Sequence, residues 1–284
     1  MNTLNAVLVK VIGLVLAPLA SWPAQVALII ISLLAGVLAA IAFRYTSPQQ
    51  RLKRVADQVR ASLLAIRLFK DDLRSIFAAQ GTLFKASGLR LIYSLPPLAV
   101  LIVPFVLLMA QLAMWYEFQP LTAGQSVLVE VVVRPDAWDQ KYSDLKLVAP
   151  EQVTVDGPVR DVQQHTITWR LSVAEAPPSD VHTRLLFEHG GTTVAEKQLV
   201  IGADAAVDRL VFVSPVRPGP DPFDRLLYPG EPAFDAASPI QRIAIDYPPR
   251  ENRVFGWRVH WLVTFLVVSI LGALAIKPIV KVQF

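Results

Sequence analysis

The sequence of 284 residues contains no cysteine, which excludes disulfide bonds, thiolate metal sites and cysteine nucleophiles. Patterns of catalytic sites are missing too, because no Gly-x-Ser-x-Gly, no His-Glu-x-x-His and no phosphate-binding loop occurs. The histidines share no spacing typical of metal ligands; the four are His165, His182, His189 and His260. We therefore expect a protein that is not an enzyme, with no cofactor, no metal and no small-molecule substrate.

Charged residues are missing from three long apolar stretches, residues 26–43, 91–114 and 259–276. A bilayer core about 30 Å thick needs about 20 apolar residues in a helix, so each stretch predicts a transmembrane helix. Rings that prefer the headgroup layer flank the stretches: Trp22, Trp115, Tyr116, Trp257 and Trp261. Pumps and transporters use charged residues inside their spans, so the lack of charge disfavours a transport function.

The first twenty residues are also apolar but are interrupted by Lys10, Gly13 and Pro18. A signal peptide fits poorly, because the only charge lies inside the apolar stretch. A short fourth span that turns at residues 21–23 is a second interpretation. We favour an interfacial or re-entrant helix over residues 1–23, because its charge and short length suit the membrane boundary.

Charge is distributed unevenly along the chain. Residues 44–90 hold ten Lys and Arg against three Asp and Glu, whereas residues 117–258 hold fourteen against twenty. The positive-inside rule places the short basic segment in the cytoplasm and the acidic region on the other side. A basic segment next to a membrane indicates contact with anionic lipid, and we expect no nucleic-acid partner.

The basic segment carries an apolar helical stripe, and Ser47 and Pro48 precede it as a cap and a first helical residue. The stripe consists of Leu52, Val55, Val59, Leu63, Ile66 and Phe69. A second helix is expected to begin near Asp71 or Asp72, with Gly81 and Gly88 as later breaks. The two helices either form a hairpin with solvated charges or lie along the membrane.

Residues 117–256 change to short alternating runs that predict strands. In HTITWRLSV, one face carries Ile167, Trp169, Leu171 and Val173. VHTRLLFEH and TTVAEKQLVI predict a hairpin that turns at Gly190-Gly191. The other strand candidates are QSVLVEVVVR, DLKLV, QVTVDG, RLVFV and QRIAIDY. About eight strands predict an immunoglobulin-like β-sandwich in which Trp169 is buried.

The stretch of residues 214–239 carries seven prolines and is expected to be a long irregular excursion before the last strand. Long ordered loops are often functional, so this stretch is the predicted contact with a protein partner. Its candidate partner-binding residues are Phe223, Tyr228 and Phe234.

These patterns divide the chain into segments with distinct expected roles. The fold class is a membrane α-helical bundle with an all-β domain. The segments are 1–23, the N-terminal helix; 24–44, the first span; 45–90, the cytoplasmic amphipathic hairpin; 91–116, the second span; 117–256, the extracytoplasmic sandwich; 257–277, the third span; and 278–284, the cytoplasmic tail.

The run LFKDDLRSIFAAQGTLFKASG, followed by YSLPPLAVLIVPFVLLMAQ, resembles the hairpin, glycine-containing connector and proline-marked core helix of the YidC/Oxa insertase superfamily. The resemblance is to the three-span archaeal and eukaryotic members and covers residues 24–116 and, loosely, 257–280. It implies a groove open to the cytoplasm and a hairpin that captures client helices. The matching groove or capture residues are Arg44, Arg51, Lys53, Arg54 and Gln111. For Gln111, an interhelical hydrogen bond is the alternative role.

The function expected from these features is that of an insertase-like or membrane-chaperone-like core that assists other membrane proteins, with a partner-binding β domain outside. The alternative is a structural anchor subunit that links cytoplasmic and extracytoplasmic partners. Membrane lipids and other membrane or envelope proteins are the expected partners. The expected location is the bacterial cytoplasmic (inner) membrane.

Overall fold

The computed structural model describes residues 7, 9–14, 18, 22–68, 73–138, 142–175, 177, 179–203, 210–254 and 256–280. Residues 9–14 are helical, and most of the N-terminal segment lies outside the described residues. Phe69, Asp71 and Asp72 lie outside them too. The chain forms two compact units, which consist of residues 1–27 with 107–261 and residues 28–106 with 262–284.

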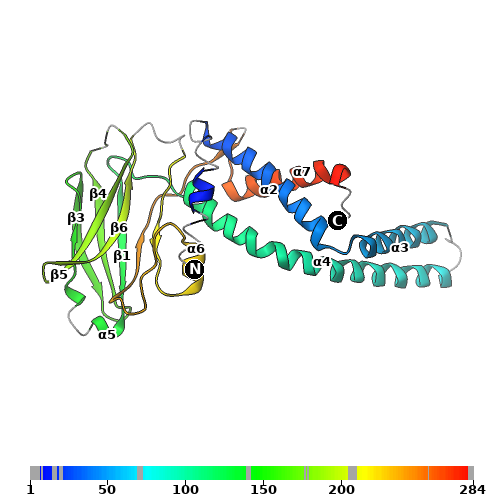
Figure 1. Cartoon of the computed structure of the whole chain (residues 1–284), viewed down its shortest axis with the longest axis horizontal. Helices are drawn as coiled ribbons and strands as arrows, with labels where there is room; N and C mark the ends of the chain where they lie inside the picture. The colour runs from blue at the N-terminus through cyan, green and yellow to red at the C-terminus, as the bar shows by residue number, and fades with distance from the viewer. Residues whose placement is uncertain are drawn as a thin grey trace. The chain divides into compact units, whose positions relative to one another are not determined.

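Among the described residues, three helices are long and apolar enough to cross a membrane, and they cover the three predicted stretches (Figure 1). They are α2 (Ala24–Thr46), residues 77–116 of α4 (Leu73–Tyr116), and α7 (Trp261–Val280). α4 is one continuous helix of 44 residues that contains Pro96, Pro97 and Pro104. The expected breaks at Gly81 and Gly88 are absent, because glycine lowers helix stability by only about 1 kcal/mol and is tolerated inside a helix.

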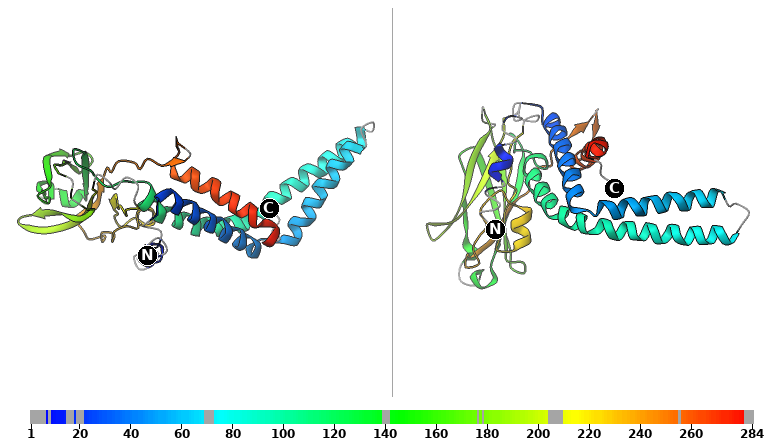
Figure 2. Two further views of the ribbon diagram at one scale, coloured as in Figure 1. Left: turned by 90° about the horizontal axis from the view of Figure 1, so that it is seen from above. Right: turned by 45° about the vertical axis from the view of Figure 1, so that its right-hand side comes forward.

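α3 (Gln49–Leu68) lies antiparallel beside the first half of α4 and forms the predicted helical hairpin (Figure 2). Leu52 and Val55 of the predicted stripe are buried, but Leu63 is exposed and Ser62 takes the buried position instead. On α4, Ala86 is buried on the inner side of the hairpin. Small side chains such as Ser62 and Ala86 let two helices approach closely.

α2 and α7 pack against each other through glycine. A Cβ atom on Gly36 of α2 would lie 2.0 Å from the carbonyl oxygen of Ser269, and a Cβ atom on Gly272 of α7 would lie 3.2 Å from Leu33. Phe105 of α4 contacts Phe265 of α7, with ring centroids 6.0 Å apart. The helical unit is therefore held by one close glycine-mediated contact and by aromatic packing.

The β domain is a two-layer arrangement of antiparallel sheets with strand orders β3-β4-β1-β8-β7 and β2-β5-β6. The strands are β1 (Ser126–Val133), β2 (Lys146–Val148), β3 (Val153–Asp161), β4 (Thr166–Val173), β5 (Val181–His189), β6 (Thr192–Ile201), β7 (Val216–Arg217) and β8 (Ile240–Ile245). Short helical segments, α5 (Pro135–Trp138) and η2 (Tyr142–Asp144), connect β1 to β2. One apolar core contains residues of both sheets.

Several strand predictions are confirmed. Trp169 is buried and meets Phe187 of the other sheet edge-on, with ring centroids 5.8 Å apart. Gly190 and Gly191 join β5 to β6 with φ angles of 58° and 81°, the left-handed conformation that a two-residue hairpin turn requires.

Two predictions about residues 209–239 are wrong. The described part of RLVFV, residues 210–213, is not a strand; it supplies buried Val211 and Val213 to the core without pairing in a sheet. The excursion is not wholly irregular either, since it holds β7 and α6 (Pro222–Leu227). Long-range packing, which local alternation does not report, decides both cases.

The C-terminal end of α4 is hydrogen-bonded to the segment that precedes α7 and to residue Val213 of the β domain. Val213 N donates to the Met114 carbonyl at 2.8 Å, Arg250 Nη1 to the Trp115 carbonyl at 3.3 Å, and Asn252 Nδ2 to the Tyr116 carbonyl at 3.4 Å. These donors satisfy carbonyls that a helix end leaves without partners. A small hairpin, β9 (Arg253–Val254) with β10 (Trp257–Arg258), follows this cap.

Candidate functional site

The basic residues predicted to capture a client lie on the surface of the helical unit. Arg44 is exposed in the last turn of α2, and Arg51, Lys53 and Arg54 are exposed on α3. The Arg51 guanidinium lies 5.7 Å above the ring of Tyr93, so this side chain also joins α3 to α4. The α3 helix thus presents positive charge next to the place where it contacts α4.

Sequence reasoning missed an apolar stripe on the outer face of α4. The spacing between successive members alternates between four and three residues, and all of them are exposed. The members are Phe77, Gly81, Phe84, Gly88, Leu91, Leu95, Leu98 and Ile102. Phe77 and Phe84 are 69% and 70% exposed, and a Cβ atom on Gly81 or Gly88 would meet nothing within 4 Å. This spacing is that of a coiled-coil seam. The two glycines concealed the pattern because they were interpreted as breaks.

Gln111 lies on α4 in the unit that contains the β domain, whereas the four basic residues lie in the other unit. Its side chain is 1% exposed, and its Oε1 has no hydrogen-bond partner among the described residues. A buried acceptor without a partner costs about 1–3 kcal/mol. Ser32 of α2 is also buried, and its hydroxyl donates to the Leu28 carbonyl at 2.6 Å.

The three predicted partner-binding residues have different environments. Phe223 on α6 is 74% exposed. Tyr228 is half-buried, with the Arg242 guanidinium 5.5 Å from its ring centre. Phe234 is 5% exposed and belongs to the core, with Arg217 stacked 4.1 Å above it. Phe234 is therefore not available as a surface contact.

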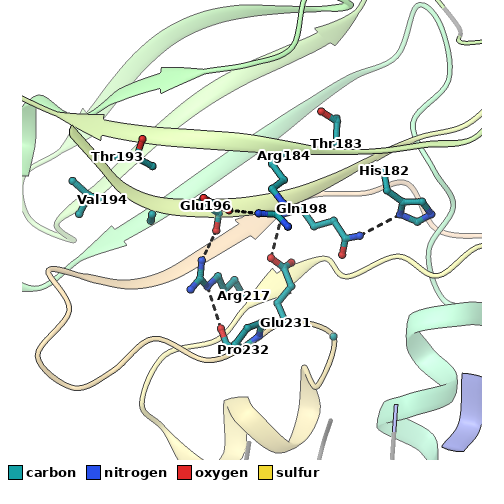
Figure 3. Close-up of a pocket in the computed structure, with 12 residues that line it drawn as sticks. His182, Thr183, Arg184, Thr193, Val194, Glu196, Gln198, Arg217, Glu231 and Pro232 are labelled. Carbon is teal, nitrogen blue, oxygen red and sulfur yellow. Dashed lines mark hydrogen bonds and ion pairs between the residues drawn. The ribbon is translucent and has the colours of Figure 1, made fainter. Parts of the chain in front are cut away.

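A groove of about 730 Å³ lies on the β domain between the β5–β6 hairpin and the turn that follows α6 (Figure 3). Its polar groups are largely paired with one another. Arg184 bonds Glu196 at 2.7 Å, and the Gln198 amide lies 3.2 Å from His182 Nδ1. The lining residues from β5, β6, β7 and the turn include His182, Arg184, Glu196, Gln198, Arg217 and Glu231. Local sequence patterns gave no signal for it, because distant segments form it.

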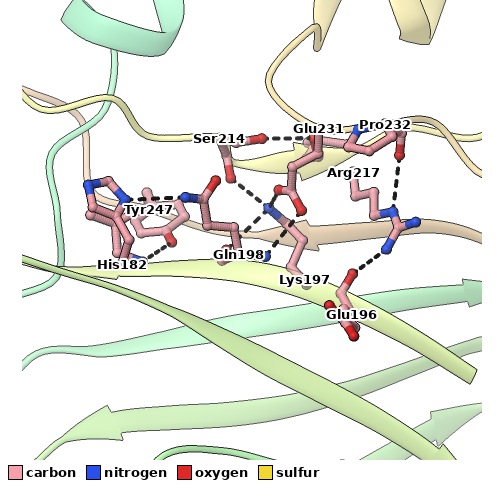
Figure 4. Close-up of polar contacts among 11 residues, drawn as sticks. His182, Glu196, Lys197, Gln198, Ser214, Arg217, Glu231, Pro232 and Tyr247 are labelled. Carbon is pink, nitrogen blue, oxygen red and sulfur yellow. Dashed lines mark hydrogen bonds and ion pairs between the residues drawn. The ribbon is translucent and has the colours of Figure 1, made fainter. Parts of the chain in front are cut away.

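Lys197 lies beneath this groove and is 0% exposed (Figure 4). Its Nζ donates to the Ser214 carbonyl at 2.7 Å and forms an ion pair with Glu231. Burial lowers the pKa of Lys197, and the adjacent Glu231 carboxylate partly offsets this effect. Tyr247, whose oxygen accepts from Val200 N at 3.0 Å, has a pKa raised by burial.

These side chains bond the outer edge of β6 in place of a further strand. Arg217 Nη1 donates to the Glu196 carbonyl at 2.6 Å, and Glu231 accepts from Gln198 N at 3.1 Å. At the far end, Leu121 N donates to the Val200 carbonyl at 3.2 Å. The cluster therefore has a clear structural role. Among the described residues, no three His, Asp or Glu side chains come together to hold a metal.

Comparison with protein families, with curated proteins and with solved structures finds no match to this chain. Its function must be inferred from its own geometry.

Proposed function

We propose that this chain is a non-enzymatic integral membrane protein whose helical core assists other membrane proteins, as in the YidC/Oxa insertases that its sequence resembles. In this proposal the α3–α4 hairpin lies in the cytoplasm of a bacterium, the chain sits in the inner membrane, and an immunoglobulin-like sandwich lies outside. The groove beside Gly230–Pro232 is the proposed contact with another envelope protein.

One observation carries the proposal, the exposed stripe of α4. It begins at Phe77, in the part of α4 beside α3, and continues in the same register to Ile102 inside the apolar stretch. An apolar seam with 3.5-residue spacing fits an apolar helix of a partner protein. Gly81 and Gly88 leave space for large side chains of that helix. The stripe provides a continuous apolar path between the hairpin and the membrane.

The charges of the hairpin suit a client with acidic or polar flanks. Lys53, Arg60 and Arg67 are seven residues apart, so they lie along one face of α3, and all three are exposed. Opposite charges across an interface accelerate association and suppress wrong partners.

The direct test is site-specific photo-cross-linking in living cells. A photoreactive amino acid in place of Phe84 should form adducts with newly made membrane proteins. The same substitution at Thr82 should not, because Thr82 is exposed on another face of α4. Equal adducts at the two positions, or unchanged insertion of every small membrane protein after depletion of this chain, would contradict the proposal.

A structural anchor is the second candidate function, and the burial of Ser32 and Gln111 favours it. A groove open to the cytoplasm would expose polar side chains to water, whereas both side chains are buried. Single cysteines at positions 32 and 111 separate the two functions, because the native chain has no thiol. Labelling by a water-soluble maleimide supports the groove, and protection supports the anchor.

A further inference from the structure

Among the described residues of the β-domain unit, a few aromatic side chains are unusually exposed. Phe223 is 74% exposed, Trp257 is 78% exposed, and Trp22 is half-exposed. Trp22 lies two residues before α2, and Trp257 lies four residues before α7. Both tryptophans therefore lie where the chain enters a candidate span. Phe223 is more than 30 residues from any of these helices in the sequence.

The fold brings the turn after α6 close to the end of α4. Trp115, at the end of α4, packs edge-on against Phe212 with ring centroids 5.3 Å apart. A Cβ atom on Gly230, three residues after α6, would lie 3.4 Å from the Phe212 ring. Figures 1 and 2 agree that α6 lies beside the C-terminal end of α4. α6 thus lies next to the end of α4, although the two helices are far apart in the sequence.

α6 presents apolar side chains on its outer face. Phe223 and Leu227, one turn apart, are exposed. Arg225 is half-buried and faces the domain, where its guanidinium donates to the Gly219 carbonyl at 3.2 Å and the Phe234 carbonyl at 3.3 Å. Water does not favour an arrangement with apolar side chains outside and a charged one inside. An apolar environment does.

We propose that α6 rests in the membrane interface, with Phe223 and Leu227 inserted among phospholipid headgroups and upper acyl chains. Trp22 and Trp257, close to the starts of α2 and α7, are placed in the same layer by this proposal, since tryptophan prefers it. The occupant is the bilayer, because α6 lies beside the C-terminal end of α4, which is a candidate span. The inference rests on the proposed membrane placement and adds to it a role for a segment that is remote from the spans in sequence.

Single cysteines test this proposal in the full chain reconstituted into phosphatidylcholine and phosphatidylglycerol vesicles. An environment-sensitive fluorophore is attached to Phe223→Cys or Leu227→Cys, and lipids that carry a nitroxide quencher are added. We expect quenching at least threefold stronger at these positions than at Val162→Cys. Val162 is 67% exposed in the β3–β4 turn. Because Val132 pairs with Thr166, this turn lies at the end of β1 that is remote from α4.

Leu98→Cys, inside the apolar stretch of α4, separates the possible failures. If position 98 is quenched and positions 223 and 227 resemble 162, the role of α6 is overturned while the membrane placement stands. If position 98 is also unquenched, the membrane placement itself fails. Protection of position 223 by a bound protein, without lipid quenching, would overturn the proposal in favour of a protein partner. Phe223→Asp should reduce the quenching at Leu227→Cys, because it removes one of the two inserted side chains.

Discussion

The ion pair of Lys197 and Glu231 is the most demanding contact in the β domain, because both charges leave water. Desolvation opposes such a pair, and the carbonyl of Ser214 and the amide of Gln198 help to offset it by bonding Lys197 and Glu231 respectively. Its formation depends on the turn after α6 folding back onto β6. The pair therefore fixes one wall of the groove and not only the strand beneath it.

Glu231→Gln should destabilise the β domain by about 3–5 kcal/mol, because Lys197 is left as an unpaired buried cation. Thermal unfolding of the detergent-solubilised chain measures this effect. The matched control is Arg184→Met, which removes the exposed pair with Glu196 and should change stability by less than about 1 kcal/mol. An equal loss of stability in the two variants would show that the buried ion pair contributes no more to stability than the exposed one.

Because Tyr247 is buried, we expect the β domain to lose stability in alkali. Burial raises its pKa above the ordinary value of about 10, so above that pH the unfolded chain releases this proton while the folded chain retains it. Stability from this group is complete below pH 10 and falls by at most about 1.4 kcal/mol per pH unit above it. In the Tyr247→Phe variant, the unfolding temperature should fall less steeply between pH 9 and 11 than it does in the native protein. Tyr228→Phe, which changes a half-exposed ring, is the control. An identical slope of unfolding temperature against pH in the native protein and both variants would contradict the prediction.

At the scale of elements, two glycines in helices should respond in opposite ways to the same change. Gly36→Ala places a methyl group against the backbone of Ser269, so α2 and α7 must separate, and we expect a loss of about 1–3 kcal/mol. Gly88→Ala adds a methyl group in open space within α4 and should stabilise the helix by about 0.5–1 kcal/mol. Thermal stability in one detergent compares them. A stabilising Gly36→Ala would show that the α2–α7 contact is not close-packed.

Elements with a strong local period could be predicted from the sequence. TTVAEKQLVI coincides with β6, and α3 contains the described part of the predicted stripe that begins at Leu52. Phe234 could not be placed, because its burial depends on Arg217 and on the fold of a proline-rich segment. The groove and the cluster around Lys197 were missed for the same reason, since a lysine inside an alternating strand gives no sign of the carboxylate that will cover it. The stripe of α4 could have been predicted from the sequence, because its members recur every 3.5 residues on average.

At the scale of the whole molecule, one candidate span separates the hairpin from the β domain, so the proposed topology places them on opposite sides of the membrane. Ser87→Cys on α4 and Val162→Cys in the β3–β4 turn are both exposed. A membrane-impermeant maleimide should label position 162 in right-side-out vesicles and position 87 in inverted ones. Labelling of both positions in the same vesicles would refute the topology.

The side chains that border β6 also bear on how neighbouring copies of the protein behave. An edge strand with free amides and carbonyls is a template for pairing with another chain, and it promotes aggregation. Here Arg217, Glu231 and Tyr247 occupy those groups along the second half of β6. Loss of Glu231 would therefore leave Gln198 N open to a strand from another molecule. The same carboxylate that neutralises a buried lysine also keeps crowded β domains from joining edge to edge.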